Sequence, residues 1–302
     1  MKSFIEFSRQ IDEKQIQYGG NANYGQVVFF AGGAGSGKGF AISNFIDKNK
    51  FKIYDVDDLK LKITRLPKMI QKYPDIQNLK LSNPEDVRRL HAIASAEKIP
   101  EKELDAWINN FHYPETLPNL LFDMTFKTLE NATWVIPSLL RAGYKSRNIH
   151  ITWVLTNYNV AVVNNKGRER IVPDDIMLLT HTGTALTMGN LLSGNLPKDF
   201  DGSFTIILNN PEETKYYPKL VPVYKKGDKF SPSHSGELEI DKHGKPIYIK
   251  IVKDFTYIKI KNPGQPLPAF QEMDAQLRQT ICKWVLENAP KIKEIEDVYG
   301  DR

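Results

Sequence analysis

Residues 27–40 constrain this chain more than any other stretch, because they read VVFFAGGAGSGKGF. The four apolar residues at 27–30 are typical of a buried strand. The segment Gly32–Lys38 matches the pattern G-x-x-x-x-G-K, and a helical spacing of apolar residues begins at Phe40. A strand, a glycine loop and a helix in this order predict a phosphate-binding loop, or P-loop. The alternative is a glycine-rich turn between strand and helix that binds nothing.

Each residue type in the loop has a physical role. Glycine tolerates positive φ angles and lets the backbone approach a phosphate closely. The loop N–H groups then point at the anion, and Lys38 supplies a positive charge for the β- and γ-phosphates. We expect the nucleotide to contact Gly32, Gly33, Ala34, Gly35, Ser36, Gly37, Lys38, Gly39 and Phe40.

The loop lacks one common element. Many P-loops have a Ser or Thr after the lysine, and its hydroxyl binds Mg²⁺. Here Gly39 and then Phe40 follow Lys38, so neither position supplies a hydroxyl. We expect Mg²⁺ to be held through water, by the nucleotide itself or by carboxylates elsewhere in the chain.

Composition sets the class of protein. With 302 residues, 41% hydrophobic and 25% charged, the chain suits a globular protein with one large α/β domain and an appendage. No apolar run is long enough to cross a membrane, and the first residues, MKSFIEFSRQIDEKQ, lack the apolar part of a secretory signal. The single cysteine, Cys282, excludes an internal disulfide and a cysteine-based zinc site. We expect a cytoplasmic protein.

Strand-like and helix-like segments alternate along most of the chain, which predicts an α/β fold with a parallel sheet flanked by helices. Helices are expected from about 82, at 131–142, before Asn165, after Pro173 and at 271–288. The expected strands are 27–30, 51–58, 119–125, 149–156 and 204–208.

We divide the chain into three parts. Residues 1–26 are expected to form a helix and a polar lead-in, and residues 27–210 a P-loop core with a polar helical insert at 61–115. Residues 211–302 are expected to form an antiparallel β extension, with strands at 246–252 and 255–261, and a final helix packed on the core. The segment 215–261 holds eleven Lys, no Arg and five acidic residues, so it carries a local net charge of +6.

Acidic residues end two of the predicted strands. The stretch IYDVDDLK places Asp55, Asp57 and Asp58 at the end of a strand that we expect beside the P-loop, where a carboxylate could accept a proton from an attacking hydroxyl. Alternation along that strand would put Asp55 and Asp57 on one face. The stretch LLFDMT places Asp123 where it could hold Mg²⁺ or its water, although it could equally cap a helix.

Two arginines lie in the later stretch NNKGRERIVPDDIM. These arginines could belong to a mobile lid, in which arginine neutralises charge on the phosphoryl group that is transferred. The alternative is that they lie in an exposed basic loop without a role in catalysis.

The order of these pieces resembles the polynucleotide 5′-kinase and zeta-toxin group of P-loop kinases, over about residues 27–190. The resemblance rests on GAGSGKG, on Val56-Asp57-Asp58-Leu59-Lys60, on Phe122-Asp123-Met124-Thr125 and on Arg168-Glu169-Arg170-Ile171-Val172-Pro173-Asp174. It implies a kinase that uses ATP and Mg²⁺. It further implies Asp57 as general base, Lys38 on the phosphates, Arg168 and Arg170 as lid arginines, and Asp123 as an Mg²⁺ or substrate contact. Asp55 is a second candidate ligand for Mg²⁺.

The acceptor stays open at this point. A nucleic-acid hydroxyl is one candidate, because the lysines of 215–261 could follow a phosphate backbone. A nucleotide sugar or another small molecule, as in zeta-toxin-like kinases, is the second. A third hypothesis is a module that binds or slowly hydrolyses ATP without an acceptor, which the missing P-loop hydroxyl favours.

Overall fold

The computed structural model describes residues 15–19, 24–80, 83–111, 116–168, 171–222, 238, 240–241 and 244–285. Of residues 56, 57, 84, 131, 132, 219, 221 and 249–251 it describes the backbone only. The helix expected within residues 1–26 lies largely outside the described residues. Contacts divide the chain into a larger unit, residues 15–210 with 257–302, and a smaller unit, residues 1–14 with 211–256.

The regular elements are defined by their hydrogen bonds. The strands are β1 (Val27–Ala31), β2 (Phe51–Asp55), β3 (Asn119–Asp123), β4 (Ile149–Leu155), β5 (Phe204–Leu208), β6 (Thr214–Pro222) and β7 (Tyr248–Lys261). The helices are α2 (Lys38–Asn44), α3 (Val56–Ile63), α4 (Pro67–Lys72), α5 (Pro84–Ala96), α6 (Ile99–Asn109), α7 (Glu130–Thr133), α8 (Ile136–Arg141), α9 (Tyr158–Lys166) and α10 (Asp174–Asn190). Residues 275–285 are also helical, and short 3-10 or π turns occupy Lys48–Lys50, Ile76–Asn78, Ser146–Asn148, Leu191–Asn195 and Phe270–Glu272.

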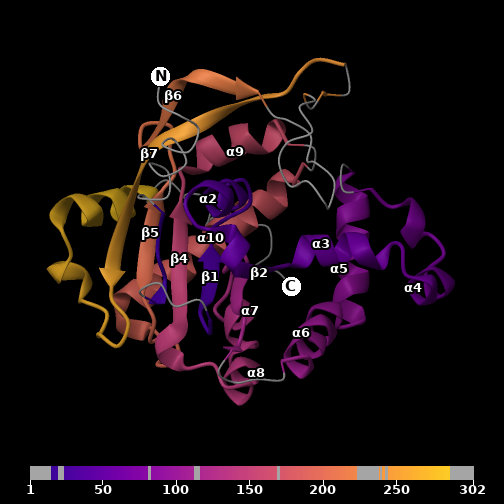
Figure 1. Ribbon diagram of the computed structural model, residues 1–302, viewed down its shortest axis with the longest axis horizontal. Coiled ribbons are helices and arrows are strands. Elements are labelled where there is room, and N and C mark those ends of the chain that lie inside the picture. The colour runs from indigo at the N-terminus through magenta and orange to yellow at the C-terminus, as the bar shows by residue number, and fades with distance from the viewer. Residues whose placement is uncertain are drawn as a thin grey trace, which may run out of the picture. The chain divides into compact units, whose positions relative to one another are not determined.

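A parallel sheet forms the centre of the larger unit (Figure 1). The strand order is β2-β3-β1-β4-β5-β7-β6, and the first five of these strands pair in parallel. Strand β1 is central, between β3 and β4, and all five of its residues are buried. The predicted fold class, α/β with helices flanking a parallel sheet, is confirmed.

Two expectations about β2 are wrong. Strand β2 pairs with β3 and not with β1, so the strand beside the P-loop strand is β3. Strand β2 also ends at Asp55, because helix α3 begins at Val56. Alternation along a strand therefore does not apply to Asp57, which lies in the first turn of a helix.

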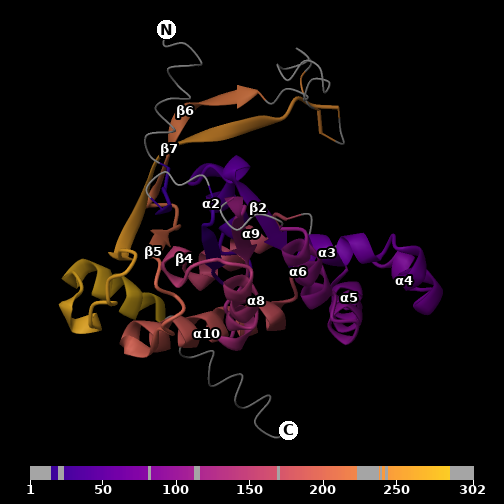
Figure 2. The same ribbon diagram turned by 60° about the horizontal axis from the view of Figure 1, so that its bottom comes forward.

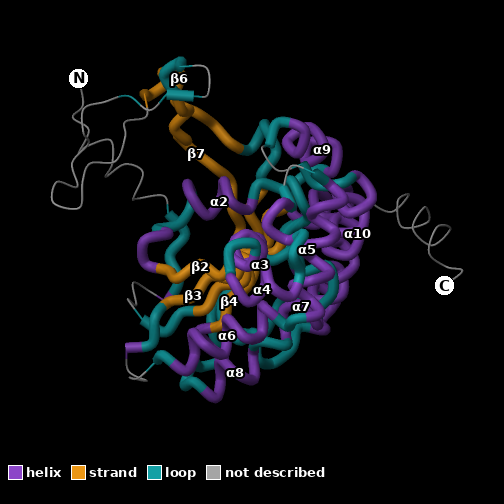
Figure 3. Tube along the Cα trace, turned by 90° about the vertical axis from the view of Figure 1, so that its right-hand side faces the viewer, coloured by secondary structure: helices purple, strands orange, loops and turns teal. Residues whose placement is uncertain are grey.

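Helices cover both faces of the sheet. Figure 3 shows α2 on the opposite side of the strands from α10, and Figure 2 shows α8 and α10 on one side. On that side Phe29 of β1 stacks on Phe122 of β3, with ring centroids 4.9 Å apart. The same core contains Leu277, Ile281 and Trp284, which confirms the expected packing of the final helix, although the helix begins at 275 and not at 271.

The insert between β2 and β3 is helical, as predicted. Helix α5 begins as the sequence indicates, since the Asn83 side chain accepts hydrogen bonds from the N–H groups of Glu85 and Asp86. A small apolar cluster of its own holds the insert together: Ile63, Met69, Ile76, Leu90, Ile93 and Ala94. Helix 131–142 was expected as one element but is two short helices, α7 and α8.

In the smaller unit, strand β6 pairs antiparallel with the first part of β7, from Thr214 opposite Phe255 to Pro222 opposite Tyr248. The two strands expected at 246–252 and 255–261 are therefore one continuous strand. Among the described residues, no helix is long and apolar enough to cross a membrane.

A polar cluster is buried at the start of β4. The His150 side chain is 1% exposed, and its Nδ1 accepts the backbone N–H of Ser203 at 2.8 Å. The proton therefore lies on Nε2, which donates to Gln26 Oε1 at 2.9 Å. Burial, together with the positive charges of Lys259 and Lys261, lowers the pKa of His150 to about 3. His150 is a neutral structural residue.

This burial predicts an acid-sensitive fold. Below pH 6.5 the unfolded chain protonates His150 while the folded chain keeps it neutral, so the free energy of unfolding decreases by about 1.4 kcal/mol per pH unit as pH falls from 6.5 toward 3. Urea unfolding across this range measures the slope. His150→Gln should flatten it, whereas His91→Gln, at an exposed position of α5, should not. Equal slopes for the two variants would contradict this assignment.

Candidate phosphate-binding site

The glycine loop joins the end of β1 to the start of α2, at the carboxyl edge of the sheet. Gly35 and Gly37 have φ angles of 74° and 85°, in the left-handed region that favours glycine. A Cβ at Gly35 would lie 2.5 Å from the carbonyl oxygen of Ala161, and one at Gly37 would collide with the Asn209 side chain. The loop conformation thus requires glycine at both positions.

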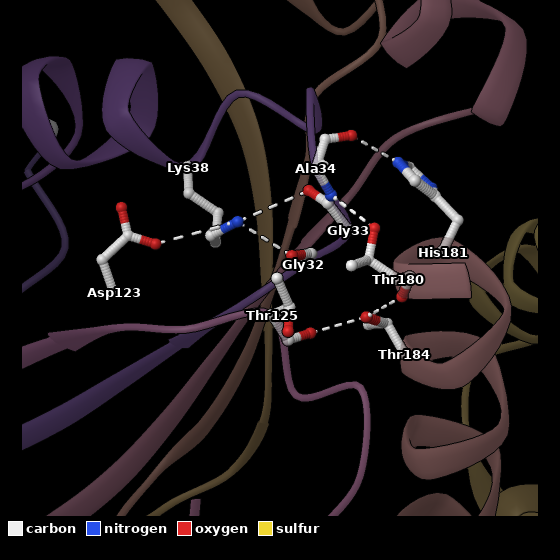
Figure 4. A network of polar contacts seen from close by, with 9 residues as sticks. All are labelled: Gly32, Gly33, Ala34, Lys38, Asp123, Thr125, Thr180, His181 and Thr184. Atoms are coloured by element: carbon white, nitrogen blue, oxygen red, sulfur yellow. Dashed lines mark hydrogen bonds and ion pairs between the residues drawn. The ribbon is translucent and has the colours of Figure 1, made fainter. Parts of the chain in front are cut away.

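Donors from elsewhere in the chain hold the carbonyl oxygens of the loop. His181 Nε2 lies 2.7 Å from the carbonyl oxygen of Ala34 (Figure 4). The carbonyl oxygen of Ser36 accepts from Thr156 Oγ1 at 2.7 Å and from Asn209 Nδ2 at 2.8 Å. Holding a carbonyl oxygen in this way fixes the orientation of its peptide plane.

Several donors of the loop lack an acceptor. Within the described part of the chain, the backbone N–H groups of Gly35 and Gly37 donate to no protein atom. The Ser36 side chain is 1% exposed, and its hydroxyl has no hydrogen-bond partner among those residues. Unused donors on a loop with positive φ angles form a concave site that suits an anion.

Lys38, the first residue of α2, folds back over the loop (Figure 4). Its Nζ donates to the carbonyl oxygen of Gly32 at 2.8 Å and to that of Gly33 at 3.4 Å. Asp123, at the end of the neighbouring strand β3, places Oδ1 3.7 Å from the same nitrogen. The ammonium group therefore lies between the loop and a carboxylate.

Helix α10 supports the loop and the segment that follows β3 through a polar face that sequence reasoning missed. Thr180 Oγ1 accepts the N–H of Ala34 at 3.1 Å, and Thr184 Oγ1 donates to the carbonyl oxygen of Thr125 at 2.5 Å. Gly183 allows the close approach, since a Cβ there would lie 2.5 Å from the carbonyl oxygen of Lys127. The helical spacing of polar residues in LLTHTGTALT is the signal that could have identified this face.

The ends of β4 and β5 supply the other supports. Thr156 follows β4 and Asn209 follows β5, and both hold Ser36 as described above. Trp284 of the final helix donates its indole N–H to the carbonyl oxygen of Thr156. Single polar residues after strands are common in such sheets, so the sequence offered little reason to select these two.

The structure brings together two of the predicted carboxylates. Asp55 and Asp123 are paired in register at the ends of β2 and β3. Asp57 lies in the first turn of α3, and its side chain is outside the described atoms. Among the described residues, no three Asp, Glu, His or Cys side chains converge as a metal cage would require.

The predicted arginine loop follows α9. The buried side chain of Asn165 closes this loop, because its Nδ2 donates to the carbonyl oxygen of Val172 at 2.8 Å and its Oδ1 accepts the N–H of Val172 at 3.0 Å. Arg168 is exposed, and Arg170 lies outside the described residues.

The two last positions of the predicted loop differ in environment. A Cβ at Gly39 would meet no atom within 4 Å, so the position opens to solvent. Phe40 packs edge-on against Phe45, with ring centroids 5.4 Å apart, and contributes to helix packing.

No protein-family model matches the chain, and no curated protein matches its sequence. Several solved structures resemble it at low identity, among them the following three. One is from the PezAT chromosomal toxin–antitoxin system of Streptococcus pneumoniae, with 14% identity, a TM-score of 0.40 and coverage of 68% of this chain and 74% of that chain. Two are AvrRxo1-ORF1:-ORF2 complexes, each with a TM-score of 0.37. The native complex has 7% identity and covers 90% and 76% of the two chains, and the complex with ATP has 8% identity and covers 89% and 80%. Scores of 0.40 or less are too low to indicate a shared function.

A matched pair of substitutions tests the loop geometry. Gly35→Ala should cost about 1–3 kcal/mol of local stability, because it combines a positive φ with a collision against the Ala161 carbonyl oxygen. Gly39→Ala should be neutral or stabilise by up to about 1 kcal/mol, because its Cβ enters open space. Thermal unfolding and amide hydrogen exchange of the loop measure both. Equal behaviour of the two variants would mean that the loop has another conformation.

Proposed function

We propose that the protein is a phosphotransferase that moves the γ-phosphate of ATP onto a hydroxyl group. The observation that supports it most directly is the glycine loop. Its carbonyl oxygens are held by protein donors, while the N–H groups of Gly35 and Gly37 have no acceptor among the described residues. Such a loop suits the β-phosphate of a nucleotide. Lys38 lies at its mouth, where it can exchange the Gly32 carbonyl oxygen for phosphate oxygens.

In the proposed reaction, the acceptor oxygen attacks the γ-phosphorus and the bond to the β–γ bridging oxygen breaks, leaving ADP. Asp57 accepts the hydroxyl proton, and Lys38 neutralises charge on the phosphates. Asp57 suits this role by its place in the first turn of α3, directly after the carboxyl end of β2. Arg168 and Arg170 belong to the loop that the hydrogen bonds between Asn165 and Val172 close, and from this loop an arginine could reach the γ-phosphate.

The carboxylates present fit a magnesium ion. Mg²⁺ commonly keeps several waters and binds one or two carboxylates together with substrate phosphates. Asp123 and the neighbouring Asp55 would provide the carboxylates, so that no hydroxyl at position 39 is needed. When bound, Mg²⁺ would neutralise the β- and γ-phosphate oxygens.

The acceptor is proposed as a nucleic-acid or nucleotide-derived hydroxyl, with a nucleotide sugar or other small molecule as the alternative. Much of the lysine-rich segment 215–261 lies outside the described residues. Within the described part, Lys261 is buried and donates to the carbonyl oxygen of Gly202 at 2.7 Å, so it is not available to a phosphate backbone. The lysines that could bind a nucleic acid are therefore those of this segment other than Lys261.

A second candidate function is ATP binding or slow hydrolysis without an acceptor. The specific observation in its favour is Gly39, which leaves the usual Mg²⁺-binding position without a hydroxyl. Phosphate release without an acceptor, compared with transfer into a pool of DNA, RNA, nucleotides and nucleotide sugars, distinguishes the two.

Substitution of the loop lysine tests the proposal. Lys38→Ala should weaken ATP binding at least tenfold and abolish transfer, because it removes a charge where phosphate charge accumulates. Lys48→Ala, at an exposed lysine shortly after the same helix, should change neither. Calorimetric titration with ATP and labelled-phosphate transfer measure the effects. Full transfer by a folded Lys38→Ala protein would exclude this kinase mechanism.

Substitution of the acidic run tests the general base. Asp57→Asn should reduce transfer by a factor of about 10² to 10⁴ with little change in ATP affinity, because a positioned base contributes that much to the rate. Asp58→Asn, at an exposed neighbour in α3, should lose far less. If Asp58→Asn is the inactive variant, or if neither loses activity, Asp57 is not the base.

A further inference from the structure

A polar cavity lies at the opposite edge of the sheet from the glycine loop. His150 is near the start of β4 and Ser203 immediately precedes β5, whereas the loop follows the end of the parallel strand β1. The cavity has a volume of roughly 330 Å³. Its lining belongs wholly to the larger unit and consists of Gln17, Gly19, Arg147, Asn148, His150, Ser203, Lys259 and Pro263.

The charge of this lining has one sign. Arg147 and Lys259 are cationic, and none of the described residues in the lining is acidic. Among the described residues, neither cation forms an ion pair, whereas the nearby Lys261 is paired with Asp201 at 3.4 Å. Two cations that share a cavity without a carboxylate repel each other, so an anion between them would lower the electrostatic energy.

The part of the lining that His150 forms is neutral and fixed. His150 Nδ1 accepts the backbone N–H of Ser203 and Nε2 donates to Gln26 Oε1, so the ring is neutral and its orientation is fixed. The His150 ring is thus held in place before any ligand binds. The guanidinium of Arg147 lies beside Gly264, where a side chain would come within 3.2–3.5 Å of it.

We propose that this cavity is a binding site for a small phosphate-bearing molecule. A phosphate group takes several donors at once, and the lining offers a guanidinium, an ammonium and the amides of Asn148 and Gln17. The volume is at the lower end of that of small-molecule sites and exceeds that of phosphate alone, so a sugar-sized group fits beside it. The proposal does not depend on the function of the glycine loop, which lies at the other edge of the sheet.

The test uses the full chain carrying Lys38→Ala, so that the loop does not compete for the probe. Inorganic phosphate, ribose 5-phosphate and acetate are titrated at pH 7.5 while ring signals of labelled histidines are followed by NMR. We expect the His150 signal to move in a saturable manner with both phosphate probes, with a Kd on the order of 1 mM or lower. Acetate should leave it unchanged.

Variants of the two cations provide the control. Arg147→Gln combined with Lys259→Gln should weaken binding of both phosphate probes about tenfold or more. Arg141→Gln, at an exposed arginine of α8 outside the lining, should bind as before. Thermal unfolding verifies that each variant is folded. No saturable shift of His150, equal affinity in the folded double variant, or equal response to acetate would overturn the proposal.

Discussion

The glycine loop depends on the hydrogen bonds that hold its carbonyl oxygens. In a short loop, a peptide plane that directs its N–H toward a ligand must direct its carbonyl oxygen toward the protein. Here His181 holds Ala34, Thr156 and Asn209 hold Ser36, and the donors come from α10 and from the ends of two strands. The packing of the sheet and of α10 thereby fixes the conformation of a loop that has few side chains of its own.

The strand order decides which acidic residue is closest to Lys38. Because β3 lies between β1 and β2, Asp123 approaches the lysine to 3.7 Å, and Asp55 is one strand further away. Helix α3 follows β2, so a residue on α3 also starts one strand further from the glycine loop than Asp123 does. The proposed division of roles, with Asp123 near the metal and Asp57 near the acceptor, agrees with this arrangement.

Much of the fold and part of the site could be predicted from the sequence. The buried strand at β1, the glycine loop and the alternation of strands and helices have local signals, and the structure bears out the α/β fold. The strand order has no local signal, since it depends on how the long insert returns the chain to the sheet, and β2 was consequently misplaced beside β1. The end of β2 was also misjudged, because the alternation of the strand was extended through Asp57, although the three-residue spacing of Val56 and Leu59 is typical of the helix α3 that begins there.

The supports of the loop were beyond sequence reasoning for a related reason. Thr156, His181 and Asn209 act through their side chains on residues more than 100 positions away in the chain. Each is an ordinary polar residue in its own segment, and only the fold brings it beneath the loop.

The most direct measurement is a crystal structure with a non-hydrolysable ATP analogue and Mg²⁺. The account predicts β-phosphate oxygens within hydrogen-bond distance of the Gly35 and Gly37 N–H groups, with Lys38 Nζ moved from Gly32 to the phosphates. The bonds from Thr156 and Asn209 to Ser36 should remain. A nucleotide bound elsewhere while Lys38 stays on Gly32, or a loop whose carbonyl oxygens have turned toward the phosphates, would contradict it.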